Sequence, residues 1–208
     1  TAGGTQEPID QVRVLSNTST GRTGRELARH LSELGAEVTL LTSRPTEAWK
    51  TWHEEQFSTS EELSAKIQHH LQSKPYTHIV HAAAVSDFIV DRIEDAKGQP
   101  LLDNKVSSSE AICLRLKPAP KIVRRLKEWS PTTKVIAFKL TSRAPSDEIQ
   151  RKVQGIFTSA SADWVVHNDL GGLNSAQGLH AFTVFNPKLQ SIHTGSKELE
   201  LLQALSRT

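Results

Sequence analysis

The sequence predicts an α/β fold with a doubly wound, mostly parallel, Rossmann-like sheet and a C-terminal β-hairpin and helix. Short apolar, β-branched runs alternate with segments of helical periodicity, which is the pattern of βαβ units. The 208 residues suit one domain with a full core, so we expect a single domain over 1–208. Motifs rich in Gly, Asn and Asp follow the strand-like runs, where doubly wound sheets bind their ligands.

The first elements follow from the N-terminal residues. Residues 1–5 are typical of the loop after a strand, so we expect a first strand before residue 1. The periodicity predicts a helix over 23–34, with Leu34 on its apolar face and Gly35 as its end. The β-branched run 38–42 has the length of a strand.

The middle of the sequence alternates in the same way. Residues 49–57 carry no recognisable pattern, and we expect a surface loop or a lid-packing loop there. A capping box at 59–62 predicts the start of the next helix. The nearly continuous apolar run 79–85 is typical of a strand buried on both faces. Pro120 suits the first position of a helix.

The remaining elements complete the alternation and then change character. Buried strands are predicted at 135–138 and 164–167, with a helix between them that Ser146 caps and that ends near residue 160. Apolar runs at 181–185 and 189–193 flank Asn-Pro-Lys and predict a β-hairpin. Ser196 then caps a last helix.

Composition excludes several functional classes. The net charge of +2 is too small to indicate nucleic-acid binding, and no apolar run approaches the roughly 18 residues of a membrane span. No signal peptide is visible, and the single Cys113 fits a reducing compartment, so we expect a cytoplasmic protein. The nine histidines lack metal-ligand spacing, so no metal site is predicted, and His81 and His167 fit the core. Cys113 is interpreted as a buried apolar residue.

A Gly-rich segment lies before the first helix. Gly3 and Gly4 would follow the first strand, and Ser19, Gly21 and Gly24 surround the predicted helix start. Glycines allow a close backbone approach, and a helix N-terminus attracts phosphate. The alternative is a Ser/Gly turn that only starts a helix. The segment lacks the G-x-G-x-x-G spacing, which disfavours NAD.

Polar residues near this segment suit acyl-transfer chemistry. Arg13 could bind a carboxylate or phosphate, and Asn17 could stabilise a carbonyl oxygen that becomes negative; the alternatives are a surface arginine and a capping asparagine. Asp87 follows a predicted strand, where ligand contacts gather, and is otherwise a turn residue. Ala83 and Ala84 could let a substrate lie against the backbone or could serve tight packing.

Seven motifs occur in order along the chain: T-A-G-G-T-x-E-P-I-D at 1–10, V-R-x-x-S-N-x-S-x-G-x-x-G at 12–24, A-A-A-V-S-D-F at 82–88, N-K-V-S-S at 104–108, P-K-I-V at 120–123, A-F-K-L at 137–140 and H-N-D at 167–169. Together they resemble the phosphopantothenate–cysteine ligases, in particular the stand-alone bacterial type. The resemblance implies one nucleotide-binding ligase domain that joins 4′-phosphopantothenate to cysteine in coenzyme A synthesis. It further implies an acyl-nucleotidylate intermediate, CTP rather than ATP as co-substrate, Mg²⁺ and a homodimer.

The resemblance also assigns roles to residues that match the family motifs. Asn17 and Lys105 match catalytic positions, with Lys105 on a flap that departs from the K-x-K-K type. Substrate positions are matched by Arg13, which would reach the neighbouring subunit's site, and by Asn17, Ala83, Ala84 and Asp87. Nucleotide positions are matched by Gly3, Ser19, Gly21, Gly24, Asp87, Lys105, Pro120, Lys121, Ile122, Val123, Phe138, Lys152 and Asn168.

Two other functions are considered beside the ligase. An NAD(P)-linked reductase would need a Tyr-x-x-x-Lys pair, but Val80 stands four residues after Tyr76, the only tyrosine. A non-catalytic nucleotide-binding module would keep Ser19 and the glycines without needing Asn17. An Asn17→Asp protein that still binds CTP but forms no product would favour the enzyme over the module.

Overall fold

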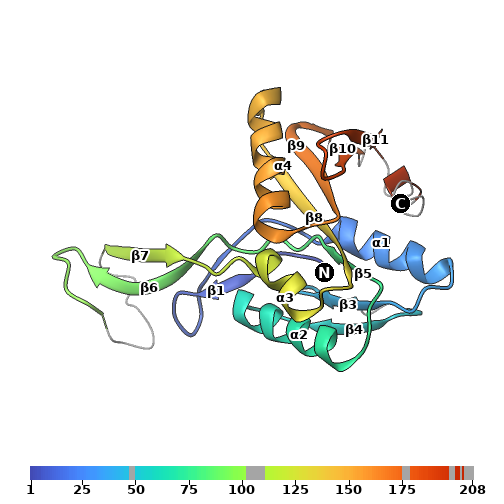
Figure 1. Ribbon diagram of the computed structural model, residues 1–208. Helices are drawn as coiled ribbons and strands as arrows, with labels where there is room; N and C mark the ends of the chain where they lie inside the picture. Colours follow the sequence, from blue (N-terminus) through green and yellow to red (C-terminus); the bar gives the residue numbers. More distant parts are fainter. Residues whose placement is uncertain (47–49, 102–110, 175–178, 197–199, 202, 204–208) are drawn as a thin grey trace.

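The computed structural model describes residues 1–46, 50–101, 111–174, 179–196, 200–201 and 203, with the backbone alone at 172–174 and 179–180. Its elements follow the predicted alternation of strands and helices (Figure 1). In chain order they are β1 Gln6–Pro8, β2 Val14–Ser16, α1 Arg22–Glu33, β3 Thr39–Thr42, β4 His53–Gln56, α2 Ser60–Ser73, β5 His78–His81, β6 Phe88–Asp95, β7 Ile112–Pro118, the 3₁₀ helix η1 Ile122–Arg125, α3 Leu126–Trp129, β8 Lys134–Thr141, α4 Ser146–Ala160, β9 Trp164–Asn174, β10 Leu179–Phe185 and β11 Ser191–Gly195.

The main sheet has five strands in the order β11-β10-β9-β8-β5. Strands β5, β8 and β9 are parallel, with His81 opposite Ala137 and Leu140 opposite Asn168. Strands β10 and β11 add the antiparallel C-terminal hairpin, which confirms the predicted hairpin. The carboxyl ends of β5, β8 and β9 therefore lie along one edge, which we call the carboxyl edge.

Residues 1–4 lie between the main sheet and the parallel pair β3–β4. Ala2 forms a parallel bridge with Thr42 at the end of β3, and Gly4 forms one with Ala84 just beyond β5. The backbone N–H of Ala2 donates to the carbonyl of Leu41 at 2.9 Å. The N-terminal motif therefore lies at the carboxyl edge, while a strand before residue 1 stays a prediction. The loop expected over 49–57 is wrong, because β4 pairs with β3 there.

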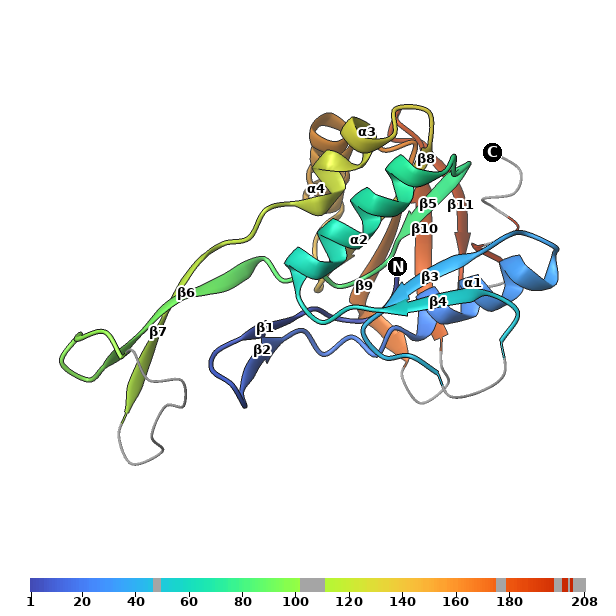
Figure 2. The same ribbon diagram turned by 90° about the horizontal axis from the view of Figure 1, so that it is seen from below.

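Helices cover both faces of the sheet, as the doubly wound prediction requires. Along β8, Val135 and Ala137 enter a core with α2, α3 and α4, whereas Ile136 enters a second core with α1. Alternate side chains of a strand point to opposite faces, so these two cores lie on opposite sides of the sheet. Figures 1 and 2 show α4 on one side of β8 and β9 and α1 on the other.

Helix ends bear out some local predictions and correct others. The hydroxyl of Thr59 accepts from the N–H of Glu62 at 3.1 Å, so the cap of α2 is confirmed. Ser146 is the first residue of α4 and Pro145 is its N-cap, with no side-chain cap bond. Pro120 does not begin a helix, because Lys121 is the N-cap of η1.

The structure also tests three predictions of which residues are buried. Leu34 is 73% exposed, because α1 ends at the preceding residue and Leu34 turns away from the sheet. Cys113 is exposed on β7, so its assignment to the core is wrong. His81 and His167 are both buried beside hydroxyl groups, as predicted.

The last helix is described only at 200–201 and 203, where Leu201 enters the second core.

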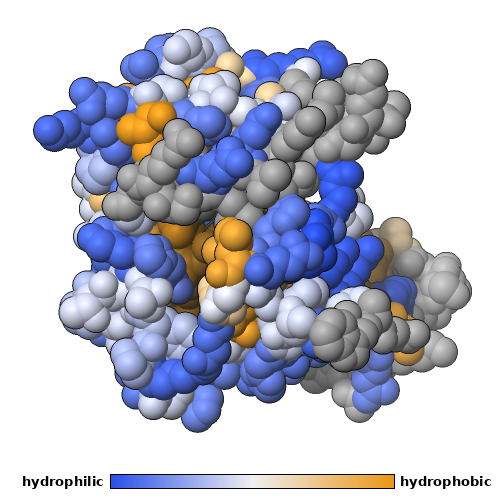
Figure 3. All heavy atoms as spheres, turned by 90° about the vertical axis from the view of Figure 1, so that its right-hand side faces the viewer, coloured by the Kyte–Doolittle hydropathy of each residue, from blue (hydrophilic) through white to orange (hydrophobic). Residues whose placement is uncertain are grey.

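Two hairpins were not anticipated from the sequence. Strands β1 and β2 pair closely after the N-terminal motif, and the longer β6–β7 hairpin extends away from the body (Figures 1 and 2). The side of the molecule that carries α1 is mainly hydrophilic, with hydrophobic residues gathered near its middle (Figure 3). Within the described residues, no helix is both long and apolar enough to cross a membrane.

Candidate active site

Three glycines from separate parts of the motif meet where α1 begins, and we call Gly3, Gly21 and Gly24 the glycine crossing. Gly3 and Gly21 have φ values of 88° and 75°, which residues with a side chain rarely adopt. A Cβ on Gly21 would lie 2.7 Å from the nitrogen of Gly3, and one on Gly24 would lie 2.7 Å from the carbonyl oxygen of Thr1. The start of α1 is therefore packed directly against the N-terminal backbone.

The loop before α1 leaves the helix start without a side-chain cap. Gly21 is the N-cap and supplies no side chain, and the hydroxyl of Ser19 accepts the N–H of Gly21 at 3.4 Å. First-turn N–H groups and the helix dipole together favour an anion at such an end. This geometry places Ser19 beside the glycine crossing.

The turn that follows β5 is fixed to the same N-terminal segment. The N–H of Ala84 donates to the carbonyl of Gly3 at 2.8 Å, and the Nδ2 group of Asn17 donates to the carbonyl of Ala84 at 2.8 Å. The N–H of Ala83 donates to the hydroxyl of Thr1 at 3.0 Å. Asn17 thus lies over the Ala83–Ala84 backbone, with its side chain exposed to solvent.

The same turn reaches the segment before η1. Asp87 forms an ion pair with Lys121, and its carbonyl accepts from the N–H of Ala119 at 2.9 Å. Pro120 and Lys121 are exposed, and Val123 is half-buried. Ile122 is only 3% exposed and belongs to the core, so it can meet a ligand only through its backbone.

Phe138 and Asn168 lie on adjacent strands near the carboxyl edge. Phe138 packs against the second core, on the α1 side of the sheet. Asn168 is opposite Leu140, two residues beyond Phe138 on the same face, and its Nδ2 group donates to the carbonyl of Ala181 at 3.0 Å. A ligand at the start of α1 would therefore face Phe138 and Asn168, and the exposed Leu140 lies beside them.

Two of the predicted residues, Arg13 and Lys152, lie on other elements and form ion pairs there. Arg13 lies at the tip of β1–β2, where its Nε donates to Asp10 at 3.0 Å. Lys152 lies on α4 and pairs with Glu148 at 2.6 Å. Lys105 lies outside the described residues.

Asp169 is a polar centre that sequence reasoning left without a role. Its carboxylate accepts hydrogen bonds from the hydroxyl of Thr141 and from the backbone N–H groups of Gly171, Arg143 and Ala144. The hydrogen bond from Thr141 is the main reason why the pKa of Asp169 lies well below its ordinary value, and the backbone N–H groups lower it further. The H-N-D motif signals this position, but only Asn168 was assigned from it.

His167 lies behind Thr141 at the same strand ends. Its Nε2 is 2.8 Å from the Thr141 hydroxyl oxygen, and burial lowers the pKa of its imidazole. The arrangement that satisfies all three groups has neutral His167 donating to Thr141, while the Thr141 hydroxyl donates to Asp169. The carboxyl end of β8 is thus joined to the middle of β9 by side chains as well as by the strand ladder.

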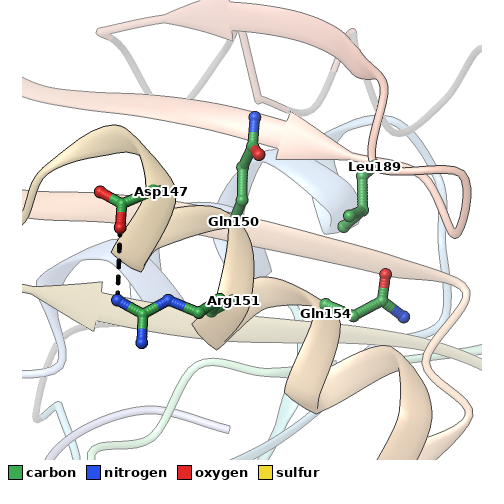
Figure 4. Close-up of a pocket in the computed structure, with 5 residues that line it drawn as sticks. All are labelled: Asp147, Gln150, Arg151, Gln154 and Leu189. Atoms are coloured by element: carbon green, nitrogen blue, oxygen red, sulfur yellow. Dashed lines mark hydrogen bonds and ion pairs between the residues drawn. The ribbon is translucent and has the colours of Figure 1, made fainter.

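A depression of about 500 Å³ lies elsewhere on the described surface, lined by Asp147, Gln150, Arg151, Gln154 and Leu189 (Figure 4). Leu189 follows Phe185, which is opposite Val165 near the start of β9. The depression therefore runs along α4 toward the sheet end opposite the carboxyl edge. It lies on the α4 face of the sheet, opposite the face that carries α1 and the glycine crossing, so we do not assign the active site to it.

The chain matches the family model described as the DNA/pantothenate metabolism flavoprotein C-terminal domain over residues 1–201. The coenzyme A biosynthesis bifunctional protein CoaBC of Thermococcus kodakarensis is 33% identical over 177 residues. That alignment covers 85% of this chain and 42% of the relative, so the chain spans less than half the relative's length.

Solved structures share the whole fold. The DNA/pantothenate metabolism flavoprotein from Streptococcus pneumoniae superposes with a TM-score of 0.85 at 26% identity, over 99% of this chain and 94% of that one. A Cab2 variant in complex with phosphopantothenate-cysteine superposes with a TM-score of 0.73 at 17% identity, over 99% and 84% of the two chains. At that identity the second likeness concerns the fold alone.

Proposed function

Because the chain belongs to the DNA/pantothenate metabolism flavoprotein C-terminal domain family, we propose that it is a ligase joining 4′-phosphopantothenate to cysteine through an acyl-cytidylate. One observation carries the proposal: Asn17 holds the carbonyl of Ala84 beside the glycine crossing. A turn that would bind the acid and a helix start that would bind phosphate thereby lie together at the carboxyl edge. The bifunctional relative is named for coenzyme A synthesis, and the Cab2 neighbour is in complex with phosphopantothenate-cysteine.

The reaction would proceed in two balanced steps. The carboxylate of phosphopantothenate attacks the α-phosphorus of CTP, the bond to the β-phosphate oxygen breaks, and pyrophosphate leaves. The amine of cysteine then attacks the acyl carbon, loses a proton and displaces CMP, which leaves an amide. Each step builds negative charge on oxygen, so donors placed around the acyl and phosphoryl groups would accelerate both.

The described residues have distinct parts in this scheme. The start of α1 with Ser19, Gly21 and Gly24 would bind the phosphates, and Phe138 and Asn168 would lie beside the nucleoside. Asn17 would turn an amide N–H toward the acyl oxygen, giving up or sharing its bond to Ala84. Asp87 would contact substrate or nucleotide through the carboxylate that now pairs with Lys121. Lys105, which lies outside the described residues, is assigned a catalytic role by family resemblance alone.

Mg²⁺ belongs to this proposal as a partner of the triphosphate, whose charge it would offset. Among the residues that the structure describes, no three His, Cys, Asp or Glu side chains gather to hold a metal ion. The ion would therefore arrive with the nucleotide rather than occupy a protein cage. CTP is proposed over ATP on family resemblance.

A homodimer is proposed with Arg13 reaching the neighbouring site. The β1–β2 tip carries Arg13 with a side chain 39% exposed, next to Val12, which is 66% exposed. Val14 is exposed as well, so a partner surface at this tip would cover two neighbouring apolar side chains. Sedimentation of the active protein at working concentration checks this: an active monomer would contradict it, as would full activity of Arg13→Ala.

Pyrophosphate release tests the proposed activity directly. Purified protein is incubated with 4′-phosphopantothenate, Mg²⁺ and either CTP or ATP, with and without cysteine. Release that requires phosphopantothenate, with the amide formed only when cysteine is present, supports the ligase, and the faster nucleotide identifies the co-substrate. Binding of nucleotide without release by folded protein would instead favour a non-catalytic nucleotide-binding module.

A further inference from the structure

Arg143 has a backbone conformation that its residue type disfavours. Its φ is 48°, in the left-handed region that residues with a side chain seldom adopt. Such a conformation persists only where the surroundings enforce it, and it is common at functional sites. Arg143 lies two residues beyond Thr141, the last residue of β8, and thus at the carboxyl edge.

Asp169 enforces this conformation from the neighbouring strand. Its Oδ1 atom accepts the N–H of Arg143 at 2.9 Å and that of Gly171 at 2.7 Å. Its Oδ2 atom accepts the Thr141 hydroxyl and the N–H of Ala144 at 3.2 Å. Four donors, three from the end of β8 and the turn after it and one from β9, therefore converge on one carboxylate, which leaves the turn at Arg143 little freedom.

Gly171 makes room for the arginine side chain. A Cβ on Gly171 would lie 3.0 Å from Cγ of Arg143, closer than ordinary contact. The aliphatic stem of Arg143 thus lies over a backbone without a side chain, and the residue is exposed. Among the described residues, no carboxylate forms an ion pair with its guanidinium group, whereas the nearby Lys152 and Arg151 are paired with Glu148 and Asp147.

We propose that Arg143 binds the phosphate groups of the nucleotide and that Asp169 is the residue that positions it. A guanidinium held at the carboxyl edge beyond Phe138 and Asn168 suits an anion whose nucleoside lies on that strand pair. This inference rests on the proposed function for the identity of its ligand, a nucleoside triphosphate. A purely structural turn at this position would be met more readily by glycine than by arginine.

Glycine at position 143 separates the two explanations. Arg143→Gly removes the guanidinium and also relieves the left-handed backbone, so a merely structural residue would be replaced without loss. We expect Arg143→Gly and Arg143→Ala to weaken CTP binding about 10- to 100-fold, as loss of a charged hydrogen bond predicts. Cytidine, which lacks phosphates, should bind both variants as it binds the wild type. Arg143→Lys should recover part of the loss, and Arg151→Ala serves as the matched surface control.

A double-mutant cycle tests the role of Asp169. Asp169→Asn keeps the shape of the side chain but cannot accept from all four donors. If Asp169 acts through Arg143, the double variant with Arg143→Gly should bind CTP no more weakly than Arg143→Gly alone, so the two effects are not additive. The KM for CTP should rise in each single variant while the KM for phosphopantothenate stays unchanged.

The outcomes keep the two proposals apart. An active wild type whose Arg143→Gly variant retains the wild-type KM and affinity for CTP overturns this inference and leaves the ligase standing. A wild type that binds CTP through Arg143 but releases no pyrophosphate overturns the ligase and leaves the phosphate contact standing. Equal weakening of CTP and cytidine in Arg143→Gly would also overturn it, since that result indicates a collapsed site.

Discussion

Replacing a glycine by alanine can destabilise a protein through backbone strain at a positive φ or through steric crowding of the new methyl group. Four glycines in this chain allow these two effects to be measured separately. Gly21 has a positive φ of 75° and a backbone atom 2.7 Å from its Cβ position. Gly35 has a positive φ of 89° with nothing within 4 Å, and Gly24 has only the close contact. Gly155 has neither, because it lies on the exposed side of α4. Alanine at each site therefore tests one combination of strain and crowding.

The expected magnitudes differ in sign as well as in size. Gly35→Ala should cost about 1–2 kcal/mol for the left-handed backbone, and Gly155→Ala should stabilise the protein by about 0.5–1 kcal/mol through helix propensity. Gly24→Ala gains the same propensity but adds crowding of about 1–3 kcal/mol. Gly21→Ala combines strain and crowding, so it should cost about 2–5 kcal/mol and lower Tm by about 5–15 °C.

Urea unfolding and thermal unfolding of the four variants provide the assay, since both report the free energy of unfolding. The reasoning requires the order Gly21→Ala, then Gly35→Ala and Gly24→Ala, then Gly155→Ala, from least to most stable. It would be refuted if Gly21→Ala were no less stable than Gly35→Ala. That result would mean that α1 can move away from the N-terminal backbone at no cost, and the glycine crossing would have no structural role.

Three further predictions follow from single contacts. Thr59→Ala should destabilise the protein by about 1 kcal/mol through loss of the α2 cap, measured by urea unfolding against Ser58→Ala. Burial lowers the pKa of His81 to about 3, so the unfolded chain binds the proton first as pH falls. The stability linked to His81 is therefore complete above about pH 6.5 and declines by up to about 1.4 kcal/mol per pH unit toward pH 3, a slope that His81→Gln should flatten. Asn17→Ala should lower kcat for pyrophosphate release about 10²–10³-fold with a change in Tm of only a few degrees, since its side chain is exposed; near-normal kcat would remove Asn17 from the chemistry.

Sequence patterns predicted the elements whose own residues carry the signal. The cap at Thr59 and the buried face of α2 are local features, so they could be recognised before any contact was known. Strand β4 could not, because its sequence His-Glu-Glu-Gln has no apolar alternation and its pairing with β3 is a tertiary contact. The β6–β7 hairpin was missed for a related reason: most of its residues are exposed, so no buried face marks its strands.

In the candidate site, too, the sequence predicted local features but not those that depend on tertiary contacts. Glycines, Asn17 and Asp87 stand out in sequence as types that suit turns and ligands, and the structure places Gly3, Asn17 and Ala84 in contact. Ile122 shows the limit of a linear motif, since its side chain belongs to the core although it lies within a motif assigned to the nucleotide. The φ of Arg143 and the four bonds of Asp169 arise only when β8 and β9 lie side by side, so no spacing along the chain could predict them.

The glycines of the glycine crossing are weaker evidence for ligand binding than Arg143 is. Gly21 is required by the packing of α1 on the N-terminal backbone, and Gly3 by the close approach of Ser43, so a bound phosphate is not needed to explain either. Arg143 differs, because within the described residues its guanidinium group has no ion-pair partner while Asp169 holds its backbone in a disfavoured conformation. A strained backbone that presents an unpaired charge to solvent suits a contact with a ligand. Arg143→Gly should therefore leave the protein as stable as the wild type, or more stable, while it weakens CTP binding. A loss of both stability and binding would instead assign the arginine to the fold.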